Sequence, residues 1–265
     1  MIAPDAHAAV VEALEANQWE LFRSVAGRGG AEVQDDGEIL WTVTGVPVAA
    51  FNGVLRATLP PDRVDDVISA VGATLDSRRA PWSWYVGPAS LPLDLADRLR
   101  ARGFRPLEGL PGMAAPVGPP AEPPAAADGL RFEEVRGEAS LEAFGTLLGL
   151  AFEMPPMVVE PFLRLLDVAA TVEPAALRNF VALDDGEPVA CGSLVLAAGV
   201  AGLYNIGVLP DRQGRGIGTA MTSALMAEGA AAGARTAVLW SSAAGTRCYR
   251  RLGFDERCRL TIYAR

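Results

Sequence analysis

The chain has 265 residues, half of them hydrophobic, which is enough to bury the core of one large domain or two smaller ones. Its formal net charge of −9 argues against broad nucleic-acid binding, which usually needs a basic surface. All 23 basic residues are arginine. Without lysine, a nucleoside-triphosphate loop that ends in Gly-Lys-Ser/Thr is excluded.

Histidine and cysteine are too few for several kinds of site. His7 is the only histidine, which argues against a histidine-based triad or a zinc site. Cys191, Cys248 and Cys258 form no C-x-x-C pair, as is typical of a reducing compartment. The first residues carry acids and no arginine, unlike a signal peptide, and the longest apolar stretch (189–204) is too short and glycine-rich to span a membrane. We therefore expect a cytoplasmic monomer or homodimer without a metal, acting neither on nucleic acid nor at a membrane.

The first half of the chain contains an imperfect copy of a segment in the second half. Leu59–Arg63 echoes Leu209–Arg212, and each segment is followed by a helical run, a strand-like run and a Gly-Phe pair. The separation between the arginine and the phenylalanine (Phe104 or Phe254) is nearly the same in both. This spacing predicts a duplicated unit.

A segment rich in proline and alanine, at 114–129, separates the two halves. Proline removes backbone donors and favours extended conformations, so the segment is expected to be a semi-rigid linker. We therefore predict a first domain at 1–113, the linker, and a second domain at 130–265.

The second domain alternates strand-like and helical runs. Asp184 to Glu187 has the composition of a hairpin turn. The alternation predicts a mixed α/β fold, with a central sheet flanked by helices. The expected strands are 130–135, 180–183, 188–196, 203–208, 236–241 and 260–263, and the expected helices are 141–152, 158–168, 216–232 and 244–252.

A glycine-rich turn lies between the expected strand ending at Val208 and the helix after Gly216. Such a turn presents unpaired backbone N–H groups at the positive end of the helix dipole, which suits a phosphate. Gly216 and Gly218 leave room for a close ligand, and Arg212 and Arg215 add positive charge.

Other phosphate motifs do not fit this turn. A dinucleotide fingerprint needs G-x-G-x-x-G and an acidic residue about 20 positions later. Here the glycines run G-x-G-x-G, and the region near Val238 is apolar. The pattern favours a ligand that contains a pyrophosphate and needs no metal.

With its downstream residues, the turn resembles the GNAT superfamily of acyl-CoA-dependent N-acetyltransferases. Gln213–Gly218 satisfies the family's Q/R-x-x-G-x-G/A motif, and Tyr249 precedes a Leu-Gly-Phe ending at Phe254, as in the family. The resemblance covers about 130–265 and implies acetyl-CoA as cosubstrate, bound between the strands that end near Val208 and Ser241.

The resemblance also implies which residues contact acetyl-CoA. The strand would hold the pantetheine arm and the thioester, and the turn would hold the pyrophosphate. Many relatives have Asn seven positions before the tyrosine, where this chain has Ser242. The implied contact residues are Ile206, Gly207, Val208, Gln213, Gly214, Arg215, Gly216, Ile217, Gly218, Thr219 and Ser242.

Tyr249 is the expected acid. A thiol has a pKa of about 8.5 and a phenol about 10, so a tyrosine hydroxyl can donate a proton or a hydrogen bond to the departing sulfur. For the general base we expect Glu153, with Glu160 as a rival, each of which could equally be a surface carboxylate. Tyr204 and Asn205 are a further alternative, because they could orient the amine through water.

The acceptor is expected to be the primary amine of a small molecule. Met154 and Met157 could line its entrance, or simply pack. An alcohol or a protein N-terminus is an alternative acceptor, and a non-catalytic acyl-CoA-binding module is an alternative function.

The first half is expected to be a degenerate GNAT-like copy. In the alignment on Arg63, Val64–Val67 replaces the glycine turn, and the carboxylates of Asp65 and Asp66 would repel a pyrophosphate. The tyrosine position is Leu99 or Arg98, and neither can act as the acid. Three aromatic residues on a candidate strand could either wall the acceptor pocket or form the core: Trp82, Trp84 and Tyr85.

Overall fold

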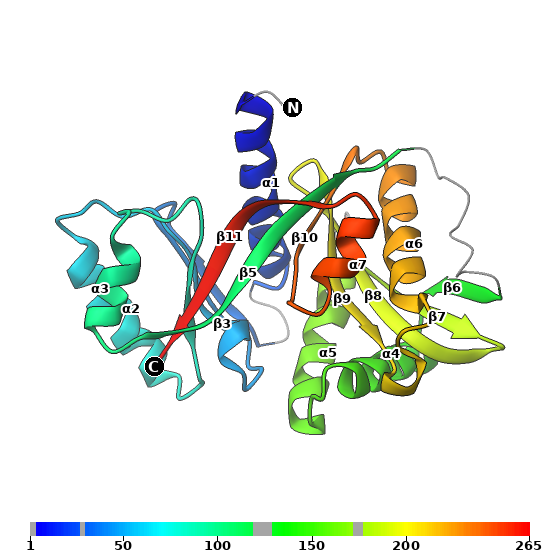
Figure 1. Ribbon diagram of the computed structural model, residues 1–265. Coiled ribbons are helices and arrows are strands. Elements are labelled where there is room, and N and C mark those ends of the chain that lie inside the picture. The colour runs from blue at the N-terminus through cyan, green and yellow to red at the C-terminus, as the bar shows by residue number, and fades with distance from the viewer. Residues whose placement is uncertain (1–3, 27–29, 119–128, 172–176) are drawn as a thin grey trace. The chain divides into compact units, whose positions relative to one another are not determined.

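The computed structural model describes residues 4–26, 30–118, 129–171 and 177–265. It divides into two compact units (Figure 1). The large unit comprises Met1–Ser24 and Gly112–Arg257, and the small unit comprises Val25–Pro111 and Cys258–Arg265. Within the described ranges, no helix combines the length and apolar character needed to cross a bilayer.

The large unit is a mixed α/β domain and has the strands and helices expected from the sequence between residues 130 and 257. The last expected strand, at 260–263, lies in the small unit instead, so the predicted second domain at 130–265 extends too far. The strand order of the large unit is β5-β10-β9-β8-β7-β6, with β9 and β10 parallel and the other neighbours antiparallel. Its elements are α1 (Pro4–Arg23), the end of β5 (Arg105–Pro116), β6 (Leu130–Glu134), α4 (Glu138–Ala151), α5 (Pro156–Ala170), β7 (Leu177–Asp184), β8 (Glu187–Ala197), β9 (Val200–Val208), η3 (Pro210–Arg212), α6 (Ile217–Ala231), β10 (Thr236–Trp240), α7 (Thr246–Arg251) and the start of β11 (Asp255–Ala264).

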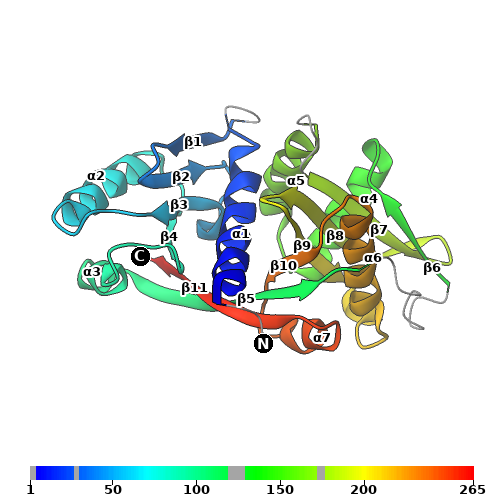
Figure 2. The same ribbon diagram turned by 90° about the horizontal axis from the view of Figure 1, so that it is seen from above.

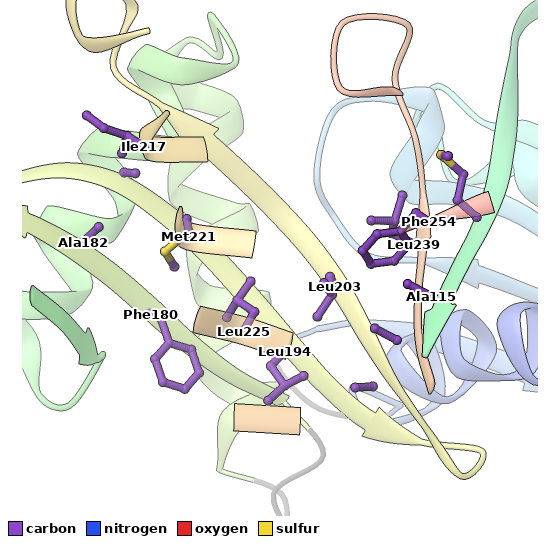
Figure 3. Close-up of a cluster of buried hydrophobic side chains, with 14 of the residues drawn as sticks. Ala115, Phe180, Ala182, Leu194, Leu203, Ile217, Met221, Leu225, Leu239 and Phe254 are labelled. Carbon is purple, nitrogen blue, oxygen red and sulfur yellow. The ribbon is translucent and has the colours of Figure 1, made fainter. Parts of the chain in front are cut away.

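Helices cover both faces of this sheet. Figures 1 and 2 show α6 on one side of β8 and β9, and α4 and α5 on the other. Figure 3 shows Met221 and Leu225 of α6 among the sheet residues Phe180, Leu194 and Leu203, all of them nearly inaccessible to solvent. This apolar cluster fixes α6, and therefore the turn that precedes it, on the sheet.

The N-terminal helix α1 belongs to the large unit. Asn17 is fully buried, and its Nδ2 donates to the carbonyl oxygens of Val195 and Ala197, each at 3.0 Å. Its Oδ1 accepts a 2.8 Å hydrogen bond from the Tyr204 hydroxyl. The helix approaches β9 so closely that a Cβ on Gly202 would lie 1.9 Å from this oxygen. The assignment of α1 to a first domain at 1–113 is therefore wrong.

The two halves exchange their last strands. β5 follows the first half, but its end pairs with β10, matching Ala115 with Ala237 and Ala114 with Val238. β11 follows the second half, but its end pairs with β4 of the small unit, matching Ile262 with Tyr85. The predicted linker thus begins too early, because 114–116 are in a strand, and its part at 119–128 lies outside the described residues.

The small unit repeats the order of the second half. Its strand order is β1-β2-β3-β4-β11, with β3 and β4 parallel. Figure 2 shows α2 beside these strands, and its apolar face enters the core of the unit. Its elements are β1 (Glu32–Asp35), β2 (Ile39–Val43), η1 (Ala49–Phe51), β3 (Asn52–Ala57), α2 (Val64–Ser77), β4 (Ser83–Val86), α3 (Leu95–Ala101), the start of β5 and the end of β11.

Matching hydrogen bonds align the two copies. The Phe104 amide donates to the Leu99 carbonyl at 3.1 Å, and the Phe254 amide donates to the Tyr249 carbonyl at the same distance. Leu99, rather than Arg98, therefore stands in the tyrosine position, and it is fully buried.

The glycine turn has no counterpart in the small unit. Helix α2 begins directly after Arg63, whereas Gln213–Gly216 intervenes before α6. The alignment of Val64–Val67 with the turn is therefore wrong, because these residues already form the first turn of a helix. At the start of α2, Asp65 accepts a hydrogen bond from Arg98 at 2.7 Å. Its carboxylate puts negative charge where the second copy has a glycine-rich helix start.

The aromatic residues in β4 and just before it belong to the core of the small unit. Trp84 is fully buried, and Trp82 packs edge-on against Phe104 with 5.3 Å between ring centroids. The Tyr85 hydroxyl donates to the Ala50 carbonyl at 2.6 Å. Of the two roles considered for them, packing is the one observed.

The strand exchange predicts that the second half cannot fold alone. A fragment of 130–265 lacks α1, which contributes Asn17. It also lacks β5, whose buried residues Met113 and Ala115 pair with β10, so the edge of β10 is left unpaired. We expect this fragment to show no cooperative urea unfolding by circular dichroism, and co-expression with 1–129 to restore it. A cooperative transition in the isolated fragment would contradict the prediction.

Candidate active site

A cleft opens where β9 and β10 cease to pair. The two strands are matched only at Ala201 with Ala237 and at Gly202 with Val238. Beyond this point β9 remains paired with β8, and β10 with β5. The facing edge of β9 therefore has backbone groups available to a ligand. The resulting cleft has a volume of about 520 Å³, and its lining residues are Ala151, Phe152, Ile206, Gly207, Val208, Arg212, Gln213, Gly214, Gly216, Ile217, Gly218, Thr219, Thr222, Ser242, Ala244, Gly245, Cys248, Tyr249 and Arg251.

A bulge in β9 sets the direction of this edge. The register of β8 with β9 shifts between Cys191 and Ser193, and Asn205 adopts a left-handed conformation with φ of 53°. The Asn205 Nδ2 donates to the Ser193 Oγ at 3.0 Å, and that hydroxyl donates to the Asn179 Oδ1 at 2.6 Å. Because Ser193 and Asn179 are buried, this chain of hydrogen bonds holds the bulge in place.

The same bonds argue against a role for Tyr204 and Asn205 in orienting an amine. The Tyr204 hydroxyl is engaged by Asn17, and the Asn205 amide by Ser193. Burial also raises the pKa of Tyr204 above its ordinary value. Both side chains support the strand instead.

The glycine turn presents amides to the cleft. Gly214 and Gly216 have φ of 76° and 84°, a region that residues with a side chain rarely adopt. The Ala220 amide donates to the Gly216 carbonyl at 3.0 Å, so the amides before it, from Ile217 to Thr219, belong to the unbonded first turn of α6. Free amides at a helix N-terminus suit an anion, so this geometry is compatible with the predicted phosphate site.

Of the two arginines expected to add positive charge to the turn, only Arg215 is left without a carboxylate partner among the described residues. The charge of Arg212 is paired, because its Nη1 contacts the Asp184 carboxylate at 3.0 Å. Gln213 donates from Nε2 to the Val208 carbonyl at 3.3 Å, which ties the turn to the end of β9. Arg215 is exposed, and within the described ranges no carboxylate pairs with it, so it can still bind a ligand.

Tyr249 reaches the cleft from α7. Its ring packs against Gly245, where a Cβ would lie 2.7 Å away, and edge-on against Phe254. Burial, followed by the nearby Cys248 thiol, raises the pKa of Tyr249 from 10.0 to about 12. The phenol therefore stays protonated throughout the physiological range, as an acid must.

The two helices beside the cleft are joined by small polar groups. The Thr219 Oγ1 and the Cys248 Sγ are 3.2 Å apart, which links the start of α6 to α7. Ser242 lies just before α7, and its Oγ accepts from the Gly245 amide at 3.2 Å. Ser242 thus both lines the cleft and orders the turn that leads to Tyr249.

Neither candidate base lines the cleft itself. Glu153 has a left-handed φ of 53° and lies on the exposed connection between α4 and α5, next to Phe152, which does line the cleft. Glu160 is exposed on α5. Met157 is 69 % exposed, so it does not pack in the core. Of these residues, Glu153 is the nearest in sequence to the lining.

Several lining residues escape prediction from the sequence. Ala151 and Phe152 line the cleft because the end of α4 lies close against β9. The contact is so close that a Cβ on Gly207 would lie only 2.7 Å from the Ala151 Cβ. The sequence gives no sign of this contact, which depends on how α4 crosses the sheet. Arg251 is also missed, although its place two residues after Tyr249 could have indicated it.

The donor set of the cleft suits an anionic ligand. It offers backbone amides, hydroxyl groups and arginine, all of which bind phosphate oxygens. Across the part of the chain that the structure describes, no group of three or more His, Cys, Asp or Glu residues is placed to hold a metal ion.

Comparisons with known proteins agree with this architecture. Residues 148–254 match the model of the acetyltransferase (GNAT) family. A GCN5-related N-acetyltransferase from Kribbella flavida has a similar structure, with a TM-score of 0.73 and 21% identity over 96% of this chain and 95% of its own. A GCN5-related N-acetyltransferase from Sphaerobacter thermophilus is also similar, with a TM-score of 0.67 and 18% identity. The match covers 100% of this chain and 93% of that protein. Comparison with curated protein sequences gave no match.

The two kinds of likeness cover different parts of the chain. The structural neighbours share the fold over nearly its whole length, whereas the family model spans the stretch that contains every residue lining the cleft. Fold, cleft and motifs agree: residues 148–254 form a domain of the acetyltransferase (GNAT) family, within a chain that shares its fold with GCN5-related N-acetyltransferases.

Proposed function

We propose that this protein transfers an acetyl group from acetyl-CoA to the primary amine of a small molecule, by direct attack of the amine while both substrates are bound. One observation carries the proposal. A single cleft brings together the unpaired edge of β9 at 206–208, the glycine turn at 213–218 and the protonated phenol of Tyr249. A phosphate-binding turn alone would support a binding module, but the partly buried phenol of Tyr249 beside it supports catalysis.

The residues of the cleft fit acetyl-CoA along its length. The amides from Ile217 to Thr219 would donate to the pyrophosphate, and the positive φ of Gly214 and Gly216 lets the backbone approach it closely. The free edge of β9 would pair with the amides of the pantetheine arm. Ser242 would contact the same arm from the start of α7.

Tyr249 would stabilise the leaving group. When bound, acetyl-CoA supplies an activated thioester carbonyl and a thiolate leaving group. Because the pKa of Tyr249 is raised to about 12, the phenol is a weaker acid than the departing thiol, whose ordinary pKa is about 8.5. We therefore infer that Tyr249 acts as a hydrogen-bond donor that stabilises the departing thiolate, which leaves as the weaker base.

The amine must lose a proton before or during attack. We propose that Glu153 accepts it through water, because Glu153 follows the lining residue Phe152 and its exposure leaves room for a bridging water. Its left-handed backbone places it at a sharp bend between α4 and α5.

Replacement of Tyr249 by Phe tests the acid. We expect kcat to fall about 10²-fold or more, because the hydrogen bond to the leaving sulfur is lost, while the Kd for acetyl-CoA changes by less than about threefold. CoA release over a panel of amines and calorimetric binding provide the two measurements. In the wild-type enzyme, the raised pKa also predicts no alkaline loss of kcat from this group below about pH 11. Normal turnover by Tyr249→Phe would disprove the role, and binding without turnover by any form would favour a binding module.

Replacement of Gly216 by Ala tests the turn. The substitution strains a left-handed position by about 1 kcal/mol and alters the amides that face the ligand. We expect the Kd for acetyl-CoA to rise at least about tenfold. Gly233→Ala is the matched control, because Gly233 has φ of 93° and open space around it but lies at the other end of α6. Equal effects of the two variants would show that strain alone is responsible.

Replacement of Glu153 by Gln tests the base. We expect kcat/KM to fall about 10²-fold near pH 7, with a smaller loss at a pH above the pKa of the amine, where no base is needed. The rival Glu160 provides the control Glu160→Gln, for which we expect no change. A loss for Glu160→Gln alone would transfer the role to that residue.

A further inference from the structure

The outer face of α7 carries an arginine groove, defined as the depression of about 680 Å³ lined by Ala243, Thr246, Arg247, Arg250 and Arg251. Arg251 also lines the cleft that contains the glycine turn and Tyr249, so the groove and the cleft adjoin. Arg247, Arg250 and Arg251 are all exposed. The groove therefore presents three guanidinium groups to solvent beside the cofactor cleft.

These arginines have no carboxylate partners in the described part of the chain. This is unusual in a protein with a net charge of −9, in which most other arginines are paired. Arg178, for example, contacts both Glu134 and Glu228, at 3.0 and 2.9 Å. Three neighbouring cations without a partner repel one another, and a multivalent anion would relieve that repulsion.

The small unit provides an internal comparison. The alignment of Leu99 with Tyr249 matches Asp97 with Arg247, and Arg100 with Arg250. In the small unit, Asp97 and Arg100 form an ion pair at 2.7 Å, so that face neutralises itself. In the copy that has the glycine turn, the acid of this pair is replaced by another arginine. The excess positive charge therefore occurs only in the copy with a phosphate-binding turn.

We propose that the arginine groove binds the 3′-phosphate on the ribose of CoA, and that this makes the enzyme selective for CoA over 3′-dephospho-CoA. The inference rests on the proposed use of acetyl-CoA. A phosphate monoester carries a charge of about −1.5 to −2 at neutral pH, and guanidinium forks bind its oxygens in pairs. With the pyrophosphate on the turn, the ribose phosphate is the remaining anionic group of the cosubstrate, and Arg251 joins the two sites.

The test compares the calorimetric Kd of the full-length protein for CoA and for 3′-dephospho-CoA, and so needs no knowledge of the acceptor. We expect the wild-type protein to bind CoA at least about tenfold more tightly, the effect of one or more charge-assisted hydrogen bonds. In the double variant Arg247→Ala/Arg251→Ala, this preference should fall below about threefold. The Kd for CoA should rise, while the Kd for 3′-dephospho-CoA should stay unchanged. Arg235→Ala is the control, because Arg235 is exposed and equally charged but lies outside both sites, and it should keep the preference.

Competition separates the phosphate from the rest of the ligand. Adenosine 3′,5′-bisphosphate should displace CoA from the wild-type protein more effectively than AMP, which lacks only the 3′-phosphate, and this difference should vanish in the double variant. Equal wild-type affinity for CoA and its dephospho form would overturn the inference, as would a preference that survives in the double variant or an equal loss for both ligands. Failure of the wild-type protein to bind either ligand would instead refute the proposed function.

Discussion

The early end of the pairing between β9 and β10 is the constraint on which the rest of the site depends. Two matched residue pairs hold the strands together, after which each continues with its other neighbour only. An unpaired strand edge inside a domain is costly unless a ligand satisfies its polar groups. The protein stabilises the parted strands from behind, through the bulge at Asn205 and its hydrogen bonds to Ser193 and Asn179. The opening between the two strands is therefore built into the sheet.

The two halves show that this strand arrangement alone does not make a site. β3 and β4 also pair in parallel at only two positions, Gly53 with Ser83 and Val54 with Trp84. Yet the small unit lacks the four residues Gln213–Gly216, has Asp65 in the first turn of its helix, and has the buried Leu99 where the second half has Tyr249. Each change removes a different feature of the proposed site: the anion-binding turn, the absence of negative charge at the helix start, and the acid. The copy keeps the frame of the fold without the groups that would act on a thioester.

The exchange of terminal strands explains how a copy without a site remains part of the molecule. β5 completes the sheet of the large unit, and β11 completes that of the small unit. Each sheet thus contains a strand contributed by the other half of the sequence. The N-terminal helix adds a second dependence, since Asn17 satisfies carbonyl groups at the turn between β8 and β9. The sheet that holds the cleft consequently relies on segments from both halves of the chain.

The sequence by itself determined the local features. Gln213–Gly218, Tyr249 and the strand and helix periods after residue 129 all follow from short-range patterns, because turn chemistry and helix starts depend on neighbouring residues. The duplication was also visible in the sequence. The insertion of Gln213–Gly216 in the second copy was not visible, because only the residues that flank it are similar in the two copies. Only the tertiary structure decided which strands pair, that α1 joins the second half, that Arg212 is neutralised by Asp184, and that Phe152 and Arg251 reach the cleft. These depend on contacts between residues far apart in the sequence, which no local pattern records.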